Sequence, residues 1–288
     1  MVIRLNIKHL FVTLFAALAV FLAGLPAFSA DEALPASADG AVTLPVIMYH
    51  SILKDPALTG TYVLPPEQLE ADLCYLKENG YTAVTMREVL AYVDGTGTLP
   101  QKPVVLTFDD GYYNNYVYVY PLMKQYGMKC VLSVFGRPTD ELAPGEHQSP
   151  NYSHVSWEQI SEMSCSGLVE IANHSYDMHT MEGRRGASKR PDETEEAYRQ
   201  ALTADVGKLQ QLLLEHTGKY PVTFAYPYGQ YAEHSEEILS SMGFRVTLSC
   251  DEGLNQIRPG DELSMLRRCN RAPGETSEAF FGRILSGG

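Results

Sequence analysis

The chain has 288 residues, of which 45% are hydrophobic and 20% charged, as expected for a globular protein with a sizeable core. Its formal net charge of −13 argues against nucleic acid as a partner, because the phosphates would be repelled. Solubility accounts for that charge, and the length fits one barrel-type domain.

The amino-terminal segment differs from the rest of the chain. Arg4 and Lys8 precede an apolar run at 10–25, and small residues follow it. This pattern is typical of a secretory signal peptide, which we place at residues 1–30. An uncleaved membrane anchor is the alternative, because the apolar run falls only slightly short of a span. In both cases we expect the folded part to be secreted or associated with the cell envelope.

Short β-rich segments alternate with helix-like segments after a small, polar linker at 31–43, so that residues 44–288 form one domain. The expected strands lie at 46–50, 82–85, 103–108, 130–135, 168–173, 222–226, 245–249 and 264–268. The expected helices lie at 66–80, 115–127, 156–167, 193–218 and 234–243, and several of them end on a glycine.

This alternation indicates parallel strands with crossover connections. It predicts an α/β fold, a distorted (β/α) barrel of about seven or eight parallel strands. A doubly wound open sheet is the alternative, since periodicity does not separate the two. The segments 136–155 and 175–192 are longer than plain connections and follow strand ends, where barrel enzymes carry their chemistry.

The chain contains five cysteines. The number is odd, so at least one stays unpaired within a monomer, the oligomeric state that we expect. They are Cys74, Cys130, Cys165, Cys250 and Cys269. Since none forms a close CxxC pair, we expect neither a thiolate metal site nor a disulfide framework.

Acidic and imidazole side chains follow two of the expected strands. Asp109 and Asp110 come directly after the strand at 103–108, and His174 follows the strand at 168–173. His179 comes five residues later and can converge with His174 only if a turn intervenes. A capped turn is the alternative interpretation of the two aspartates, because Asp and Gly are common turn residues.

Two imidazoles and two carboxylates at neighbouring strand ends suit a metal site. Two neutral imidazoles and one carboxylate bind a divalent ion such as zinc and leave positions open for water and substrate. The second carboxylate could then accept a proton from water. The ion would also offset the repulsion between the adjacent acids Asp109 and Asp110.

Three segments resemble the polysaccharide deacetylases of the nodulation-protein-homology type, carbohydrate esterase family 4. They are TFDDG at 107–111, HSYDMH at 174–179 and FAYPYG at 224–229, in the order of the family, within a resemblance that spans roughly residues 44–270. The resemblance implies a distorted (β/α) barrel that removes acetyl groups from N-acetylated sugars of peptidoglycan, chitin or poly-N-acetylglucosamine.

The resemblance also implies a role for each matching residue. Asp109 would be the general base, and Asp110, His174 and His179 would hold a divalent metal, Zn²⁺ first and Co²⁺ or Ni²⁺ as alternatives. The backbone N–H of Tyr228 would bind substrate by stabilising the oxyanion. The alternative interpretation of the last segment is an ordinary Pro-Gly turn.

Two features depart from the family's pattern. The family has an Arg that orients the base where this chain has Ala225, and Arg268 is our candidate to replace it. Alternatively, Arg267, Arg268 and Arg271 are surface charges. The family's late histidine, a general acid, is also missing, and no histidine follows His234.

His50 is the candidate for the missing acid. The segment PVIMYHS at 45–51 has the same form, an apolar strand that ends in His, and first and last strands are neighbours in a closed barrel. An early MYHS segment also resembles the branch that acts on poly-N-acetylglucosamine. A buried structural histidine is the alternative.

We therefore expect a secreted, metal-dependent hydrolase that removes N-acetyl groups from a polysaccharide containing N-acetylglucosamine and releases acetate. A polysaccharide is the expected partner, and a membrane only if the amino-terminal segment is uncleaved. An O-acetyl esterase on a polysaccharide and a degenerate, glycan-binding barrel are the alternatives.

Overall fold

The computed structural model describes residues 40–143 and 145–285. The signal peptide expected at residues 1–30 and most of the linker lie outside this part. Val42 and Thr43, which the sequence analysis places in the linker, belong instead to strand β1 (Val42–Leu44), because β1 pairs antiparallel with β11 (Asn255–Ile257). Within the described ranges, no helix has the length and hydrophobicity that a membrane span requires.

The main sheet is parallel throughout. Its strand order is β12 (Leu263–Leu266), β10 (Val246–Leu248), β9 (Thr223–Ala225), β8 (Val169–Asn173), β7 (Cys130–Val134), β6 (Pro103–Phe108), β2 (Val46–Tyr49) and β13 (Cys269–Asn270). A short strand, β5 (Thr82–Ala83), also pairs with β6. A separate pair consists of β3 (Ser51–Ile52) and β4 (Val63–Leu64).

The connection between the two ends of this strand order shows that the sheet is curled. Only Arg267 and Arg268 separate β12 from β13, and such a connection spans about 11 Å at most. In a flat sheet the two outermost of eight strands would lie roughly 34 Å apart. The sheet must therefore curve back on itself, which confirms the predicted distorted barrel and excludes the open sheet.

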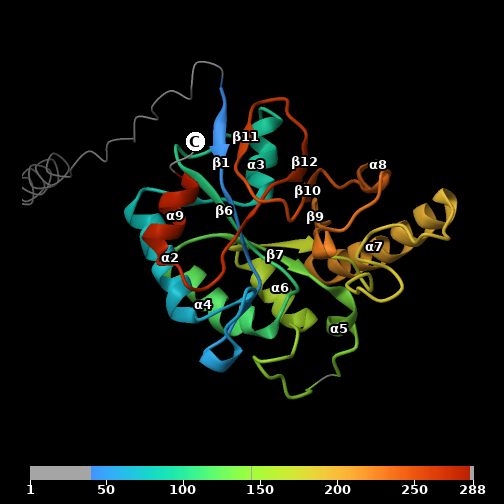
Figure 1. The fold of residues 1–288 in the computed structure, drawn as a ribbon, viewed down its shortest axis with the longest axis horizontal. Helices are drawn as coiled ribbons and strands as arrows, with labels where there is room; N and C mark the ends of the chain where they lie inside the picture. Colours follow the sequence, from blue (N-terminus) through green and yellow to red (C-terminus); the bar gives the residue numbers. More distant parts are fainter. Residues whose placement is uncertain (1–39, 144, 286–288) are drawn as a thin grey trace, which may run out of the picture. The chain divides into compact units, whose positions relative to one another are not determined.

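Helices cover the outside of this sheet. Figure 1 shows α2, α4 and α9 grouped on the left and α7 on the right. The α-helices are α2 (Pro66–Glu78), α3 (Met86–Val93), α4 (Tyr120–Tyr126), α5 (Gly136–Asp140), α6 (Trp157–Cys165), α7 (Glu195–Thr217), α8 (Ser235–Ser241) and α9 (Ser277–Leu285). Shorter helical turns are η1 (Pro56–Leu58), η2 (Asn115–Val119) and η3 (Pro227–Gly229).

The helix starts follow local sequence signals. Ser156 and Thr85 each form a capping box at the start of α6 and α3, with Gln159 and Glu88 as the reciprocal partners. Helix α6 was expected from the sequence and α3 was not, although the Thr-x-x-Glu pattern of α3 was present. Helix α9, which packs against α2, was also not expected.

The alternation of side chains along the strands divides the core into two layers. One layer contains Ile47, Leu106 and Leu132 and joins residues of the covering helices. The other contains Val105 and Ala225 on the opposite faces of the strands. Ala225 is fully buried in this second layer, so the position at which the family has an Arg is here part of an aliphatic cluster.

One buried charge fastens the helical layer to the sheet. Asp72 of α2 accepts hydrogen bonds from Arg271 (2.9 Å), Ser277 (2.7 Å) and Tyr49 (3.1 Å). All four residues are buried, and every buried carboxylate must be satisfied in this way. Arg271 therefore has a structural role, and its interpretation as a surface charge is wrong.

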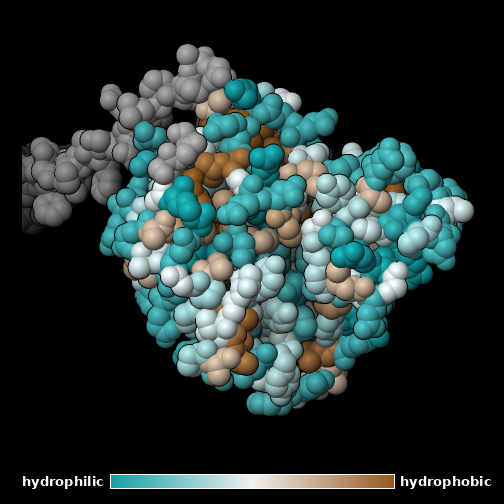
Figure 2. Space-filling view, viewed as in Figure 1, coloured by the Kyte–Doolittle hydropathy of each residue, from teal (hydrophilic) through white to brown (hydrophobic). Residues whose placement is uncertain are grey.

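The exterior agrees with the charge of the chain. The face drawn in Figure 2 is largely hydrophilic, and the hydrophobic patches on it are separate from one another. Seven large hydrophobic side chains are exposed in the described part of the chain. Three of them, Leu58, Tyr62 and Tyr228, line one cavity, which holds the candidate site.

Candidate active site

The candidate active site is a cavity of about 540 Å³ at the carboxyl ends of the parallel strands. Asp109 and Asp110 follow β6, His50 follows β2 and His174 follows β8. Because parallel strands end at the same edge of a sheet, these four side chains meet there. The cavity is also lined by His179 and Tyr228.

Asp110 is the centre of one half of the site. Its Oδ1 lies 3.0 Å from Nε2 of His179 and 3.4 Å from Nε2 of His174. One ligand atom from each of these three residues lies within 4.8 Å of the others. The turn between the two histidines comes from Ser175, whose φ of +71° is left-handed.

Both histidines are oriented through their other ring nitrogen. Nδ1 of His174 lies 2.7 Å from the carbonyl oxygen of Ala225, and Nδ1 of His179 lies 3.2 Å from the hydroxyl of Tyr228. The two Nε2 atoms are thereby left to face Asp110. Two imidazoles and one carboxylate directed at a common point are a donor set that suits a divalent ion with open coordination positions.

Backbone strain is concentrated at this site. Among the described residues, four non-glycine residues have positive φ, and three of them are Asp110 (+71°), Ser175 (+71°) and Tyr228 (+57°). A left-handed conformation costs a non-glycine residue about 1–2 kcal/mol. Such strain persists where the surrounding structure imposes it, and its clustering here points to a functional site.

Asp109 has a different set of partners. Nη1 of Arg268 lies 2.9 Å from its Oδ1 and 2.8 Å from its Oδ2, and both side chains are almost fully buried. Arg268 is held in turn by the carbonyl oxygen of Ser249 (2.8 Å) and by Thr107 (3.3 Å). The interpretation of Arg268 as a surface charge is therefore wrong, whereas Arg267 is exposed.

The charges in the site keep both carboxyls ionised. Burial raises the pKa of Asp109, but the charges of Arg268, His174 and His50 together outweigh burial, and the pKa falls below its ordinary value. Burial likewise raises the pKa of Asp110, but hydrogen bonds from His174 and His179 hold it well below that value. Burial lowers the pKa of His174, but its hydrogen bond to Asp110 and the charges of Asp109 and Asp110 together outweigh burial and raise that pKa.

His50 approaches Asp109 from the β2 side. Its Nε2 lies 3.9 Å from Oδ2 of Asp109, and its ring packs on that of Tyr62, with centroids 4.6 Å apart. Burial lowers the pKa of His50. Since β2 pairs with β13, this side of the site also adjoins the last strand, as the sequence analysis expects of a closed barrel.

Several residues of the site were missed by the sequence analysis. Tyr62, Tyr112 and Cys250 line the cavity. His154 packs against Tyr112, with ring centroids 5.0 Å apart, and burial lowers its pKa to about 4. These residues belong to none of the three sequence motifs, because they lie in connecting segments that only the fold brings together.

The long segment after β7 forms part of the wall of the site. The N–H of Tyr113 donates to Ser153 O (2.8 Å), and the N–H of Val155 donates to Gly111 O (3.0 Å). Residues 153–155 thus run alongside the Asp-Asp-Gly turn. The structure thus places the backbone of this segment beside the candidate site, and a functional role of the segment stays a prediction.

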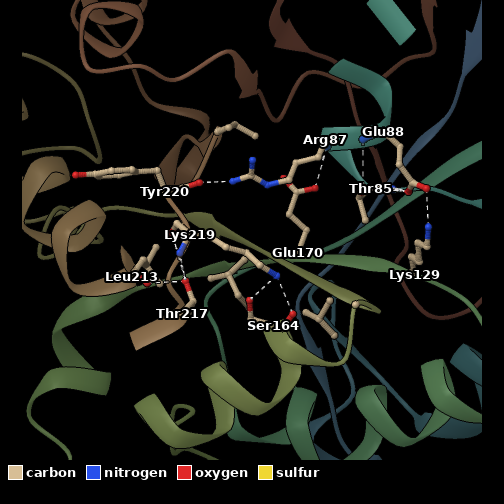
Figure 3. A pocket seen from close by; sticks show the side chains of 14 residues that line it. Thr85, Arg87, Glu88, Lys129, Ser164, Glu170, Leu213, Thr217, Lys219 and Tyr220 are labelled. Carbon is tan, nitrogen blue, oxygen red and sulfur yellow. Dashed lines mark hydrogen bonds and ion pairs between the residues drawn. The ribbon is translucent and has the colours of Figure 1, made fainter. Parts of the chain in front are cut away.

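A second cavity, of about 590 Å³, lies at the opposite end of the barrel. Figure 3 shows that its charged side chains bind one another or the backbone. Lys129 pairs with Glu88 (2.5 Å), Lys219 donates to Ser164 O (3.1 Å), and Arg87 donates to a carbonyl oxygen. This cavity is therefore not the candidate active site.

Comparisons with known proteins agree with this geometry. A sequence model of the family described as polysaccharide deacetylase matches residues 96–247. The chain is 28% identical to YxkH of Bacillus subtilis (strain 168), over 84% of this chain and 76% of that protein. It is 26% identical to the poly-β-1,6-N-acetyl-D-glucosamine N-deacetylase of Escherichia coli (strain K12), over 83% of this chain but only 38% of that protein.

Solved structures give the same result. A de-N-acetylase from Aggregatibacter actinomycetemcomitans superposes with a TM-score of 0.71 at 26% identity, covering 82% of this chain and 98% of that one. IcaB from Ammonifex degensii superposes with a TM-score of 0.66 at 30% identity, covering 80% and 92%. The chain belongs to the polysaccharide deacetylase family, a family of hydrolases.

Proposed function

We propose that the protein is a metal-dependent de-N-acetylase that acts on a polysaccharide containing N-acetylglucosamine. The observation that carries this proposal is that the two adjacent acids, Asp109 and Asp110, have different partners. Asp110 faces two histidines, whereas Asp109, next to it in the chain, faces Arg268 and is not part of the group of converging donor atoms. A metal site with an unliganded base beside it suits hydrolysis of an amide.

The metal would be held by Asp110, His174 and His179, whose donor atoms converge. When bound, a divalent ion such as Zn²⁺ would act as a Lewis acid that polarises the acetamide carbonyl and acidifies water. Zinc suits this donor set, and Co²⁺ or Ni²⁺ are alternatives.

Asp109 supplies the base. Its lowered pKa keeps the carboxylate ionised at neutral pH, so it can remove a proton from a water molecule that attacks the acetamide carbon. Arg268 fixes both carboxylate oxygens and thereby takes the place of the arginine missing at Ala225. The new bond joins the water oxygen to the acetamide carbon.

The remaining steps need an oxyanion donor and a proton for the leaving nitrogen. The backbone N–H of Tyr228, in its left-handed turn, is our proposed oxyanion donor. When the carbon–nitrogen bond breaks, the nitrogen takes up a proton, and acetate leaves. Nε2 of His50 lies 3.9 Å from Oδ2 of Asp109, which is longer than a hydrogen bond. We propose that His50, through a closer approach or one bridging water, carries the proton taken up by Asp109 to the leaving nitrogen.

The walls of the cavity support a sugar as substrate. Tyr62 and Tyr228 are 56% and 44% exposed, and each packs against a histidine of the site. Aromatic faces of this kind suit the apolar face of a sugar ring. The Escherichia coli relative named above, a poly-β-1,6-N-acetyl-D-glucosamine N-deacetylase, supports that polymer. The signal peptide expected at 1–30 supports action outside the cytoplasm.

The experiment is acetate release by purified protein from three substrates: oligomers of β-1,6-linked N-acetylglucosamine, peptidoglycan and O-acetylated xylan. We expect release from the first, loss of release after a chelator removes metal, and recovery with Zn²⁺. Greater release from O-acetylated xylan would make the protein an esterase. No release from any of the three substrates by zinc-loaded protein would contradict the proposed hydrolysis.

A further inference from the structure

The two histidines of the proposed metal site differ in what holds them. His174 is buried, and the partner of its Nδ1 is the buried carbonyl of Ala225. The partner of Nδ1 of His179 is the hydroxyl of Tyr228, a side chain that is 44% exposed and lines the cavity. One metal-facing imidazole is thus oriented by the backbone and the other by a single surface phenol.

The chemistry of imidazole gives that phenol a task. A neutral histidine that offers Nε2 to a metal carries its proton on Nδ1, which then needs an acceptor. The oxygen of Tyr228 lies 3.2 Å from Nδ1 of His179 and can accept a hydrogen bond from this N–H. Partners of this kind fix the tautomer and the ring orientation of a metal ligand and raise its basicity.

The packing of two loops holds Tyr228 in this position. A Cβ on Gly186 would lie only 2.4 Å from the carbonyl oxygen of Pro227, so the two backbones are in close contact there. The N–H of Gly186 donates to Thr180 O (2.9 Å), beside His179 in the chain. The rings of His179 and Tyr228 then lie with centroids 4.5 Å apart.

We propose that Tyr228 is a positioning residue: its hydroxyl orients the ring of His179 and thereby sets the metal affinity of the site. This role is separate from that of the Tyr228 backbone N–H, and it rests on the metal site of the proposed function. Phenylalanine at position 228 would keep the ring and the backbone but leave Nδ1 of His179 without its acceptor.

The test is the zinc affinity of metal-free protein, measured by competition with a chromophoric chelator. We expect Tyr228→Phe to bind zinc about 10-fold more weakly than the unchanged protein, as for other partners of metal ligands. Tyr62→Phe is the matched control, because Tyr62 lines the same cavity and packs on His50, outside the proposed ligand set. We expect it to bind zinc with unchanged affinity.

A second readout separates positioning from general damage. We expect the absorption bands of Co²⁺ to change in Tyr228→Phe and not in Tyr62→Phe, with equal melting temperatures for the metal-free forms. Unchanged zinc affinity in Tyr228→Phe, or an equal loss in Tyr62→Phe, would overturn the inference. Failure of the unchanged protein to bind zinc would instead overturn the metal site of the proposed function and the inference with it.

Discussion

The two ends of the barrel both hold buried carboxylates, but the groups that satisfy them differ. At the amino ends of the strands, Glu170 accepts from the N–H of Arg87 (3.0 Å) and the hydroxyl of Thr223 (3.3 Å). At the carboxyl ends, Asp109 and Asp110 face an arginine and two histidines. The partners of Glu170 hold the backbone in place, whereas the groups around Asp109 and Asp110 can exchange protons or hold a metal.

Burial raises the pKa of the carboxyls at both ends, but the net shifts have opposite directions because the partners differ. Burial raises the pKa of Glu170, and its neighbours only partly offset this. At the other end, nearby charges and hydrogen bonds outweigh burial and lower the pKa of Asp109 and of Asp110. A buried acid is thus a candidate for chemistry when charged partners keep it ionised. Glu170 instead stabilises the amino end of α3.

Among substitutions of the residues around these carboxylates, the largest expected effect follows from removing the cation that holds Asp109. Arg268→Met removes the charge that most lowers the pKa of Asp109, so that pKa rises. The base is ionised only above its pKa, and the acidic limb of kcat/KM therefore moves to higher pH. We expect kcat/KM at neutral pH to fall about 100-fold, measured as acetate release across pH.

Two variants control this prediction. Arg268→Lys keeps a cation and should give an intermediate shift, whereas Arg267→Met changes the neighbouring exposed residue and should leave the profile unchanged. Because breaking a buried ion pair also destabilises the fold, by about 3–5 kcal/mol, rates are compared below each melting temperature. An acidic limb that stays in place in Arg268→Met would show that Arg268 does not tune the base.

The amino end should respond in stability and not in rate. Glu170→Ala leaves the N–H of Arg87 without its acceptor, which costs about 2 kcal/mol of unfolding free energy. We expect urea unfolding to show this loss, while kcat/KM per folded molecule stays within about twofold. Glu170→Gln keeps one acceptor oxygen and should lose less. A large loss of kcat/KM in folded Glu170→Ala would contradict the assignment of a purely structural role to the amino end of the barrel.

The smallest expected effect concerns the wall of the active-site cavity. Tyr62→Ala removes an exposed ring and should raise KM for a hexamer of N-acetylglucosamine about fivefold, for loss of about 1 kcal/mol of apolar contact. We expect kcat to change little. Tyr152→Ala is the control, because Tyr152 is 72% exposed and is not among the residues that line the cavity. Equal KM values would exclude sugar stacking on Tyr62.

The residues at the carboxyl ends of the strands differ in how far the sequence could predict them. Asp109, Asp110 and His174 follow strands directly, and their convergence follows from parallel pairing. Arg268 was one candidate from the sequence, with a surface charge as the alternative, and deciding between them needed the fold, because only the curled sheet brings the segment after β12 to the end of β6. That contact is non-local, and no pattern near Asp109 announces it.

Other parts of the fold were missed for local reasons. Helix α3 has eight residues, too few for a clear periodic signal, although its capping box was readable at Thr85. The aromatic walls were missed because Tyr62 and Tyr112 lie in connecting segments without periodicity. The sequence therefore predicted the architecture and the motif residues, whereas the partners that set their chemistry came from tertiary structure.

The central claim is that the adjacent acids have different tasks, and matched amide variants test it most directly. Zinc content and acetate release are measured together for Asp109→Asn and Asp110→Asn. We predict that Asp109→Asn retains about one zinc per chain and loses acetate release by about 1,000-fold or more. Asp110→Asn should lose both. Loss of zinc from Asp109→Asn, or substantial activity in it, would contradict the account.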